Sequence, residues 1–326
     1  MATPATLTFS SKCQTMWNLS FTPPQIIEAQ VLTRLPDELR RPVPSNWADA
    51  NKPGQIVDCF LEGPCFDRAG NLYLTDIPHG RIFRVTSDLQ WHCVADYGGW
   101  PNGLAVHADG SVWIADYRQG ILRLDPKTGV ISTMLGHRNS ESFKGINDLT
   151  FDPNGNLYFT DQGQTGLHDP TGRVYRWCTD SGKLDLLLSN APSPNGIAIS
   201  ADGKALFLAV TRANQIWRAP LLPDGSISKM GAFQTFYGSS GPDGMALDSE
   251  ARLVVAHASL GGAFVLNARG EVTHFVKSPS GATVTNLAFR PDSMQIVMTE
   301  SATGSLLVAN LPAVGLELYS HKQSAE

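Results

Sequence analysis

Short apolar runs alternate with turn residues along most of the chain. Runs such as Leu72–Leu74, Val112–Ile114 and Leu157–Phe159 are β-branched, aromatic or aliphatic throughout, which is typical of strands covered on both faces. The turn dipeptides Asp109-Gly110 and Asn154-Gly155 precede two of these runs and predict tight hairpins. The pattern therefore predicts an all-β fold of short strands joined by hairpins.

A longer repeat groups these hairpins into six units. Each unit opens with a residue whose side chain ends in an oxygen, and successive openers are 40, 45, 48, 48 and 43 residues apart. This spacing is the period of a β-propeller blade. In a closed six-bladed ring the openers would meet on the axis, where we expect a metal site. The openers are Glu62, Asn102, Asn147, Asn195, Asp243 and Asn286.

Counting residues along the two strands of each predicted hairpin places a second set of residues opposite the openers. Folding each hairpin about its turn pairs an opener with the residue 14 positions later, or 15 in one unit. We expect the aspartates of this set to cap blade loops through backbone hydrogen bonds. The predicted partners are Asp76, Asp116, Asp161, Val210, His257 and Glu300.

The repeat covers residues 56–318 and leaves a segment without repeats on each side. We expect residues 1–55 to form an N-terminal arm, in which a strand at Gln25–Thr33 completes the last blade and closes the propeller. Pro42–Gly54 is predicted to be a loop over one face, and whether it covers the site is left open. Residues 319–326 are predicted to be a frayed tail.

Composition narrows the range of partners. The 326 residues are 42% hydrophobic and 17% charged, and the formal net charge of −5 argues against nucleic acid or an anionic membrane as a partner. No stretch reaches the length of a membrane span, and the first residues lack the pattern of a secretory signal. We therefore expect a cytoplasmic monomer or homodimer that acts on a small molecule.

The openers carry the candidate metal chemistry. Carboxylates and carboxamides are hard oxygen donors, and Ca²⁺ takes about six to eight of them. We expect Ca²⁺, with Mg²⁺, Mn²⁺ or Zn²⁺ as alternatives. The connections that leave the blades at the opener end would form walls above the ion. From these walls and the openers we predict five substrate-binding residues, His79, Trp100, Asn102, Tyr117 and Arg118.

Four motifs in order resemble those of the regucalcin (senescence marker protein) and gluconolactonase family over residues 56–312. They are Glu62-Gly63-Pro64, Asn147-Asp148, Pro194-Asn195-Gly196, and Pro242-Asp243-Gly244-Met245 with Leu247-Asp248. The resemblance implies a six-bladed propeller with one axial divalent cation and hydrolysis of lactones. It also implies that Glu62, Asn195 and Asp243 are metal ligands, and that Asn147 matches an asparagine that binds metal, substrate or water.

The predicted reaction is the metal-dependent opening of a lactone. By resemblance, Asp243 would act as both ligand and general base, and His257, predicted opposite it, is the alternative base. Gly145 stands where sugar-lactone members of the family carry an arginine, which favours a less polar substrate. Two other functions remain open. One is a hydrolase of phosphorus esters or fluoridates that uses the same oxygen ligands around the ion, and the other is a non-enzymatic calcium-binding propeller.

Overall fold

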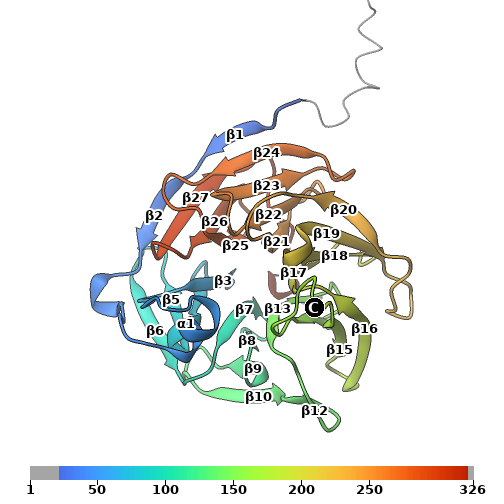
Figure 1. Cartoon of the computed structure of the whole chain (residues 1–326), viewed down its shortest axis with the longest axis horizontal. Coiled ribbons are helices and arrows are strands. Elements are labelled where there is room, and N and C mark those ends of the chain that lie inside the picture. Colours follow the sequence, from blue (N-terminus) through green and yellow to red (C-terminus); the bar gives the residue numbers. More distant parts are fainter. Residues whose placement is uncertain (1–21, 322–326) are drawn as a thin grey trace, which may run out of the picture.

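The chain folds as a six-bladed β-propeller (Figure 1), seen in a computed structural model that describes residues 22–321. In each blade the strands that follow the N-terminal arm run outward in sequence order, from the strand nearest the axis toward the rim. Blade 1 contains β3 (Leu61–Phe66), β4 (Leu72–Asp76), β5 (Arg81–Val85) and β6 (Trp91–Asp96). Blade 2 contains β7 (Pro101–Val106), β8 (Val112–Asp116), β9 (Gly120–Leu124) and β10 (Ile131–Leu135).

The remaining blades repeat this arrangement. Blade 3 contains β13 (Ile146–Phe151), β14 (Leu157–Asp161), β15 (Gly172–Cys178) and β16 (Lys183–Ala191), preceded by the small hairpin of β11 (His137–Arg138) and β12 (Glu141–Ser142). Blade 4 contains β17 (Pro194–Ile199), β18 (Ala205–Val210), β19 (Gln215–Pro220) and β20 (Gly231–Thr235). Blade 5 contains β21 (Pro242–Leu247), β22 (Leu253–His257), β23 (Gly262–Leu266) and β24 (Val272–Lys277). Blade 6 contains β25 (Val284–Phe289), β26 (Gln295–Glu300) and β27 (Ser305–Asn310).

The N-terminal arm closes the ring through two strands. β2 (Gln30–Arg34) pairs antiparallel with β27 and supplies the outer strand of blade 6. β1 (Gln25–Glu28) pairs parallel with β24 and adds a fifth strand to blade 5. The strand expected at Gln25–Thr33 is thus divided between two blades, and the buried Ala29 lies at the division. Pairing of the first strands with the last blades leaves no open junction in the ring.

The predicted loop at Pro42–Gly54 contains a short helix, α1 (Asn46–Asn51). Ser45 caps it, because its side-chain oxygen accepts a hydrogen bond of 3.2 Å from the amide of Ala48. Trp47 is buried against Phe60, with ring centroids 4.7 Å apart. The prediction was wrong here because the burial of Trp47 against the propeller, a tertiary contact, stabilises one and a half turns of helix.

The predicted frayed tail is ordered as far as His321. Tyr319–His321 form a 3₁₀ turn, and the Tyr319 ring packs against His107 and Phe151 at centroid distances of 5.4 and 5.6 Å. Arg68 donates a hydrogen bond to the carbonyl of Ser320. Aromatic packing and this hydrogen bond therefore hold Tyr319–His321 in place, and neither contact could be inferred from the repeat.

Within residues 22–321 we find no helix that is long and apolar enough to cross a membrane.

The observed pairing of the first two strands of a blade differs by one residue from the pairing predicted by counting along the hairpin. In blade 1, Asp76 lies opposite Leu61, and Glu62 lies opposite Thr75. Two residues of β3, Gly63 and Pro64, face a single residue of β4, so a β-bulge separates the opener from the hairpin turn. The bulge recurs in other blades, where the pairs are Pro101 with Asp116, Ile146 with Asp161, Pro194 with Val210, and Pro242 with His257. In these five blades the predicted partner thus faces the residue before the opener.

Candidate metal and substrate site

The second residue of the first strand in each blade forms a ring around the axis. Five of the six predicted openers occupy this position, and the strands that carry them surround the centre of Figure 1. In blade 6 the pairing of Val284 with Glu300 gives this position to Thr285, so Asn286 lies one residue further along. The prediction of Asn286 as an opener was wrong because the hairpin of blade 6 is one residue longer than assumed. The five openers at this strand position are Glu62, Asn102, Asn147, Asn195 and Asp243.

The next residue of each first strand is glycine in four blades, and in the other two it is Asp148 or Asn286. These two side chains come from blades 3 and 6, on opposite sides of the ring. Each fills space beside a glycine of a neighbouring blade. A Cβ added at Gly103 would collide with Asp148 Oδ1, and one added at Gly244 would collide with Asn286 Oδ1. The glycines therefore leave room for these two polar side chains between neighbouring first strands.

Glu62 is buried and held by two donors. The amide of Gly63 donates to its Oε2 at 2.7 Å, and Asn286 Nδ2 donates to the same oxygen at 3.0 Å. Asn286 is itself fixed, because its Oδ1 accepts a hydrogen bond of 2.8 Å from the amide of Leu287. The orientation of the Glu62 carboxylate thus depends on a residue of the last blade.

Three buried carboxyl groups are close enough to influence one another electrostatically. Burial raises the pKa of Glu62, and it raises the pKa of Asp148 to about 8 with a further contribution from Glu62. The pKa of Asp243 lies well above its usual range, because the group is buried and because Glu62 and Asp148 carry like charge. Asn195 and Arg212 oppose this rise. Such a set of carboxylates is stabilised when a cation binds among them.

Asn147 offers an oxygen without a partner. Its Nδ2 donates to Gln162 Oε1 at 3.1 Å, and Gln162 Nε2 donates to Ser193 Oγ at 3.0 Å, so the amide orientation is set. Asn147 Oδ1 is buried and accepts no hydrogen bond from the described residues. A buried carbonyl oxygen in this state is costly unless a donor or a cation binds it.

The donor set fits a hard divalent cation. Within residues 22–321, no three His, Cys, Asp or Glu side chains are grouped so that they could hold a metal ion by themselves. A cation on the axis would therefore need amide oxygens from Asn147 and Asn195 together with Glu62 and Asp243. Mixed carboxylate and amide oxygens are the ligands that Ca²⁺ and, with stricter geometry, Mg²⁺ accept.

His257 has the properties of a neutral, buried imidazole. Burial lowers its pKa to about 4. The amide of Ser259 donates to its Nδ1 at 3.4 Å, whereas Nε2 has no hydrogen-bond partner among the described residues. Its ring lies 5.6 Å from Phe236 and 6.0 Å from Phe264, between centroids. The nitrogen able to accept a proton is thus turned to the backbone.

Three of the predicted substrate-binding residues lie together. The ring of Trp100 is 5.9 Å from Tyr117, and the guanidinium of Arg118 lies 5.3 Å from the Trp100 ring. Asn102 is half-buried in the axial ring. His79 lies on the blade 1 loop, where its Nε2 is 3.2 Å from the carbonyl of Val57. No described contact joins His79 to the Trp100 group.

Tyr117 covers Gly145, the position where the resemblance implied an arginine. A Cβ at Gly145 would lie 2.5 Å from the Tyr117 ring, and the Gly145 φ of 154° also disfavours a side chain. Gln164 Nε2 donates to the Tyr117 hydroxyl at 2.9 Å and holds the ring there. The space that a side chain at position 145 would need is thus taken by an aromatic ring.

The predicted capping role of the outer aspartates is confirmed. Asp76 accepts a hydrogen bond of 2.8 Å from the amide of Phe60, and Asp161 accepts one of 2.8 Å from the amide of Gly145. Asp116 accepts from the amides of Arg118 and Gln119 at 2.9 and 2.8 Å. These carboxylates shape the loops around the site.

Sequence reasoning did not assign Asp148 to the site, and it placed Arg212 only in a connection expected to form the walls above the ion. Asp148 was visible as a departure from the glycine that follows the opener in the Asn-Gly or Asp-Gly dipeptide of three other units. The effect of Arg212 on the pKa of Asp243 could not be predicted from the repeat, because it depends on how blades 4 and 5 adjoin.

Comparison with known proteins gives a family match. The model of the SMP-30/gluconolactonase/LRE-like region matches residues 60–302, which is more than half of the chain. A curated relative, lactonase drp35 of Staphylococcus aureus strain MRSA252, is 33% identical over 245 residues, covering 72% of this chain and 73% of the relative.

Solved structures show the same fold. A gluconolactonase of Xanthomonas campestris aligns with a TM-score of 0.70 and 23% identity over 78% of this chain and 86% of its own. A calcium-binding protein, regucalcin from Agrobacterium tumefaciens strain C58, aligns with a TM-score of 0.70 and 20% identity over 92% of this chain and 100% of its own.

Proposed function

The chain belongs to the SMP-30/gluconolactonase/LRE-like family, and we propose that it hydrolyses lactones with a divalent cation bound on the propeller axis. The observation that carries this proposal is the buried Asn147 Oδ1, which accepts no hydrogen bond from the described residues and belongs to the ring that also carries the buried Glu62 and Asp243. Glu62, Asn147, Asn195 and Asp243 would hold the cation, with Ca²⁺ as the expected ion and Mg²⁺, Mn²⁺ or Zn²⁺ as alternatives. When bound, it supplies a Lewis acid for the ester carbonyl and its developing oxyanion.

Asp243 is the proposed general base. Its carboxylate lies on the axial ring, where a water next to a substrate carbonyl can give up a proton to it. His257 is less suited to this role, since its Nδ1 accepts a backbone hydrogen bond and its low pKa leaves it a weak base. Asp243 would later return the proton to the ring oxygen that leaves.

The substrate is proposed to lie against Trp100, Tyr117 and Arg118, with Asn102 as the half-buried polar contact from the ring. Tyr117 over Gly145 favours a lactone with an apolar body, because aromatic surface replaces a guanidinium that would bind hydroxyl groups. His79 stands apart from this group and would act through its contact with the Val57 carbonyl.

A lactone panel tests the proposal. Acid release from sugar, aliphatic and aromatic lactones is measured with Ca²⁺, Mg²⁺, Mn²⁺ or Zn²⁺ added to metal-free protein. We expect turnover only with an added divalent cation. Faster turnover of a phosphotriester than of every lactone would favour the phosphorus-ester alternative, and tight Ca²⁺ binding without any turnover would favour a calcium-binding propeller.

A further inference from the structure

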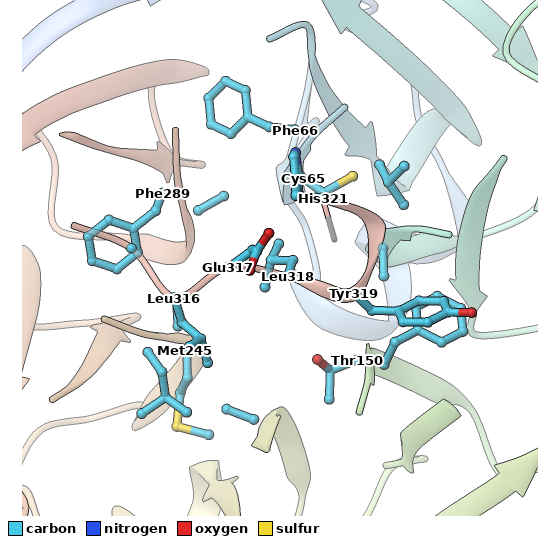
Figure 2. Close-up of a pocket in the computed structure, with 18 of the residues that line it drawn as sticks. Cys65, Phe66, Thr150, Met245, Phe289, Leu316, Glu317, Leu318, Tyr319 and His321 are labelled. Atoms are coloured by element: carbon cyan, nitrogen blue, oxygen red, sulfur yellow. The ribbon is translucent and has the colours of Figure 1, made fainter. Parts of the chain in front are cut away.

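A cavity of about 400 Å³ lies in the centre of the propeller, on the hairpin side of the axial ring. We call it the inner chamber. Asp148 and Asn286 border it toward the ring, and the segment Gly315–Tyr319, the C-terminal strap, borders it at the other end. Figure 2 shows Leu316, Glu317 and Leu318 of the strap running across the chamber. Its volume is within the range of small-molecule sites.

The chamber stays open because the first strand of each blade carries a small side chain at one position. The fifth residue of these strands is alanine in four blades, and all six residues at this position line the chamber. They are Cys65, Ala105, Thr150, Ala198, Ala246 and Ala288. Larger apolar side chains, including Met245, Phe289 and Leu316, surround this ring of small residues (Figure 2). The walls are therefore mostly apolar.

The strap is attached at both ends. The amide of Leu316 donates to the carbonyl of Leu247 at 2.9 Å, and the amide of Gly315 donates to Ser293 at 3.0 Å. At its other end, Tyr319 packs against His107 and Phe151. Leu318, between the attachments, is 47% exposed. The C-terminal strap is thus held at both ends and closes the chamber on the side away from the axial ring, while Leu318 in its middle is exposed to solvent.

Two side chains that line the chamber carry nitrogen atoms without hydrogen-bond partners. Arg290 Nε is buried and unpaired among the described residues, and its guanidinium lies 5.5 Å from the Phe66 ring. His321 Nε2 is also buried and unpaired there, while its Nδ1 is 3.0 Å from Ser320 Oγ. Nothing in the proposed lactone reaction uses either group. Unpaired N–H donors beside an apolar cavity point to a ligand with an acceptor atom.

The charges around the chamber argue against an anionic ligand. Asp292 and Glu317 border it, and both are exposed carboxylates. They offset the positive charge of Arg290, and a carboxylate ligand would be repelled by them. A neutral acceptor would satisfy the Arg290 donor without this repulsion.

We propose that the inner chamber is a second binding site, which takes a small neutral molecule with an apolar body and one carbonyl oxygen that accepts a hydrogen bond from the Arg290 guanidinium. The site is separate from the proposed lactone site, since the axial ring lies between them. Its ligand need not be a lactone.

Calorimetric titration of the full, Ca²⁺-supplied protein tests this. Acetophenone is the probe, ethylbenzene has the same carbon skeleton without the oxygen, and benzoate adds a charge. We expect acetophenone to bind roughly tenfold more tightly than ethylbenzene, as one hydrogen bond from a charged donor allows. Benzoate should bind more weakly than acetophenone. Absence of acetophenone binding, or tighter binding of benzoate, would overturn the proposal.

Two variants locate the site. Arg290→Met keeps an apolar stem beside Phe66 but removes the donor, so acetophenone and ethylbenzene should bind equally. The matched control is Arg218→Met, since Arg218 also lies over a phenylalanine ring, Phe207 at 5.8 Å, but outside the chamber. It should keep the tenfold preference. Ala246→Leu fills the chamber and should weaken both probes at least tenfold, and if this variant does not fold, Arg290→Met decides alone. A preference that survives in Arg290→Met, or unchanged binding in folded Ala246→Leu, places the ligand elsewhere and ends the proposal.

Discussion

Asn286 Nδ2 donates a hydrogen bond of 3.0 Å to Glu62 Oε2 across the junction between the last blade and the first. The same junction carries hydrogen bonds from Thr285 Oγ1 and Ser301 Oγ to the carbonyl of Leu61, at 3.3 and 2.6 Å. Closure of the ring and orientation of a proposed metal ligand therefore depend on the same contacts. Because Oε2 already accepts two hydrogen bonds, we expect Glu62 to bind a cation mainly through its other carboxylate oxygen.

Replacing Asn286 with alanine should weaken the binding of Ca²⁺ by about 10- to 100-fold, because a partner that orients a ligand is lost. Calorimetric titration of metal-free protein measures this directly. Asn267→Ala is the matched control, since Asn267 Nδ2 donates to Glu271 Oε2 at 2.7 Å in an outer turn. Equal Ca²⁺ affinity in Asn286→Ala and wild type would show that this hydrogen bond does not position the ligand.

Removal of the ion should lower stability and activity together. Binding confined to the native state stabilises it by about 2.7 kcal/mol when the ion is at about 100 times its Kd. Exhaustive chelation should therefore lower the melting temperature and abolish lactone hydrolysis, and added Ca²⁺ should restore both. Full turnover by protein shown by elemental analysis to hold no metal would rule out the metal-dependent mechanism.

Asp243 and His257 can be separated by substitution. Asp243→Asn keeps an oxygen donor but removes most of the basicity, so turnover should fall by about 10² or more even at saturating metal. His257→Gln should cost less, since the His257 imidazole is held by the backbone. Turnover of each variant is compared after its metal content is measured. Near-normal turnover in Asp243→Asn with an inactive His257→Gln would reverse the assignment.

The stability of the metal-free protein should fall as the pH rises. The pKa of Asp148 is about 8 in the native state, above the value of about 3.9 expected for an unfolded chain. A raised carboxyl pKa contributes stability that is fully present below about pH 4 and is lost as the pH rises through about 8. Melting temperatures in chelator should therefore decrease from pH 5 to 8.

Asp148→Asn should flatten this pH dependence, whereas Asp125→Asn, which changes an exposed turn residue, should leave it unchanged. Added Ca²⁺ should reverse the trend, because protons compete with the cation for the same group of carboxylates. A slope that is the same in wild type and Asp148→Asn would mean that Asp148 is ionised in the metal-free protein.

The axial ring could be predicted from the sequence because it depends on a repeat. The openers recur at nearly constant spacing and five of them lie at the same position of the first strand of a blade, so a period of one blade was enough to bring these five together. The sixth was misplaced by one residue. Alignment of Leu104-Ala105-Val106 with Leu287-Ala288-Phe289 would have placed Thr285 in the ring, but an Asn in the glycine position resembled an opener. Hairpin counting cannot detect a bulge, because a bulge changes the register without changing the turn.

Features outside the repeat depend on tertiary contacts and were less predictable. The helix at Asn46–Asn51 is fixed by the burial of Trp47, and the strap is fixed by Tyr319. The inner chamber follows from small residues at one strand position, a pattern that is visible only once the register is known. In the sequence of a single strand, an alanine at that position gives no sign that a cavity lies beside it.

The last prediction concerns the choice of lactone. Tyr117 occupies the space over Gly145, and Trp100 lies beside it, so an apolar or aromatic lactone should have a higher kcat/KM than gluconolactone. Each buried methylene contributes about 0.8 kcal/mol, so a few of them outweigh the weak contacts left for hydroxyl groups. Trp100→Ala should narrow the gap by lowering kcat/KM for the apolar lactone alone, whereas Trp217→Ala, on the outer part of blade 4, should not. The comparison needs initial rates of acid release for each lactone with each variant at saturating Ca²⁺. If gluconolactone is hydrolysed at least as efficiently as every apolar lactone, the aromatic residues do not select the substrate, and Arg118 beside Trp100 becomes the first residue to test for binding hydroxyl groups.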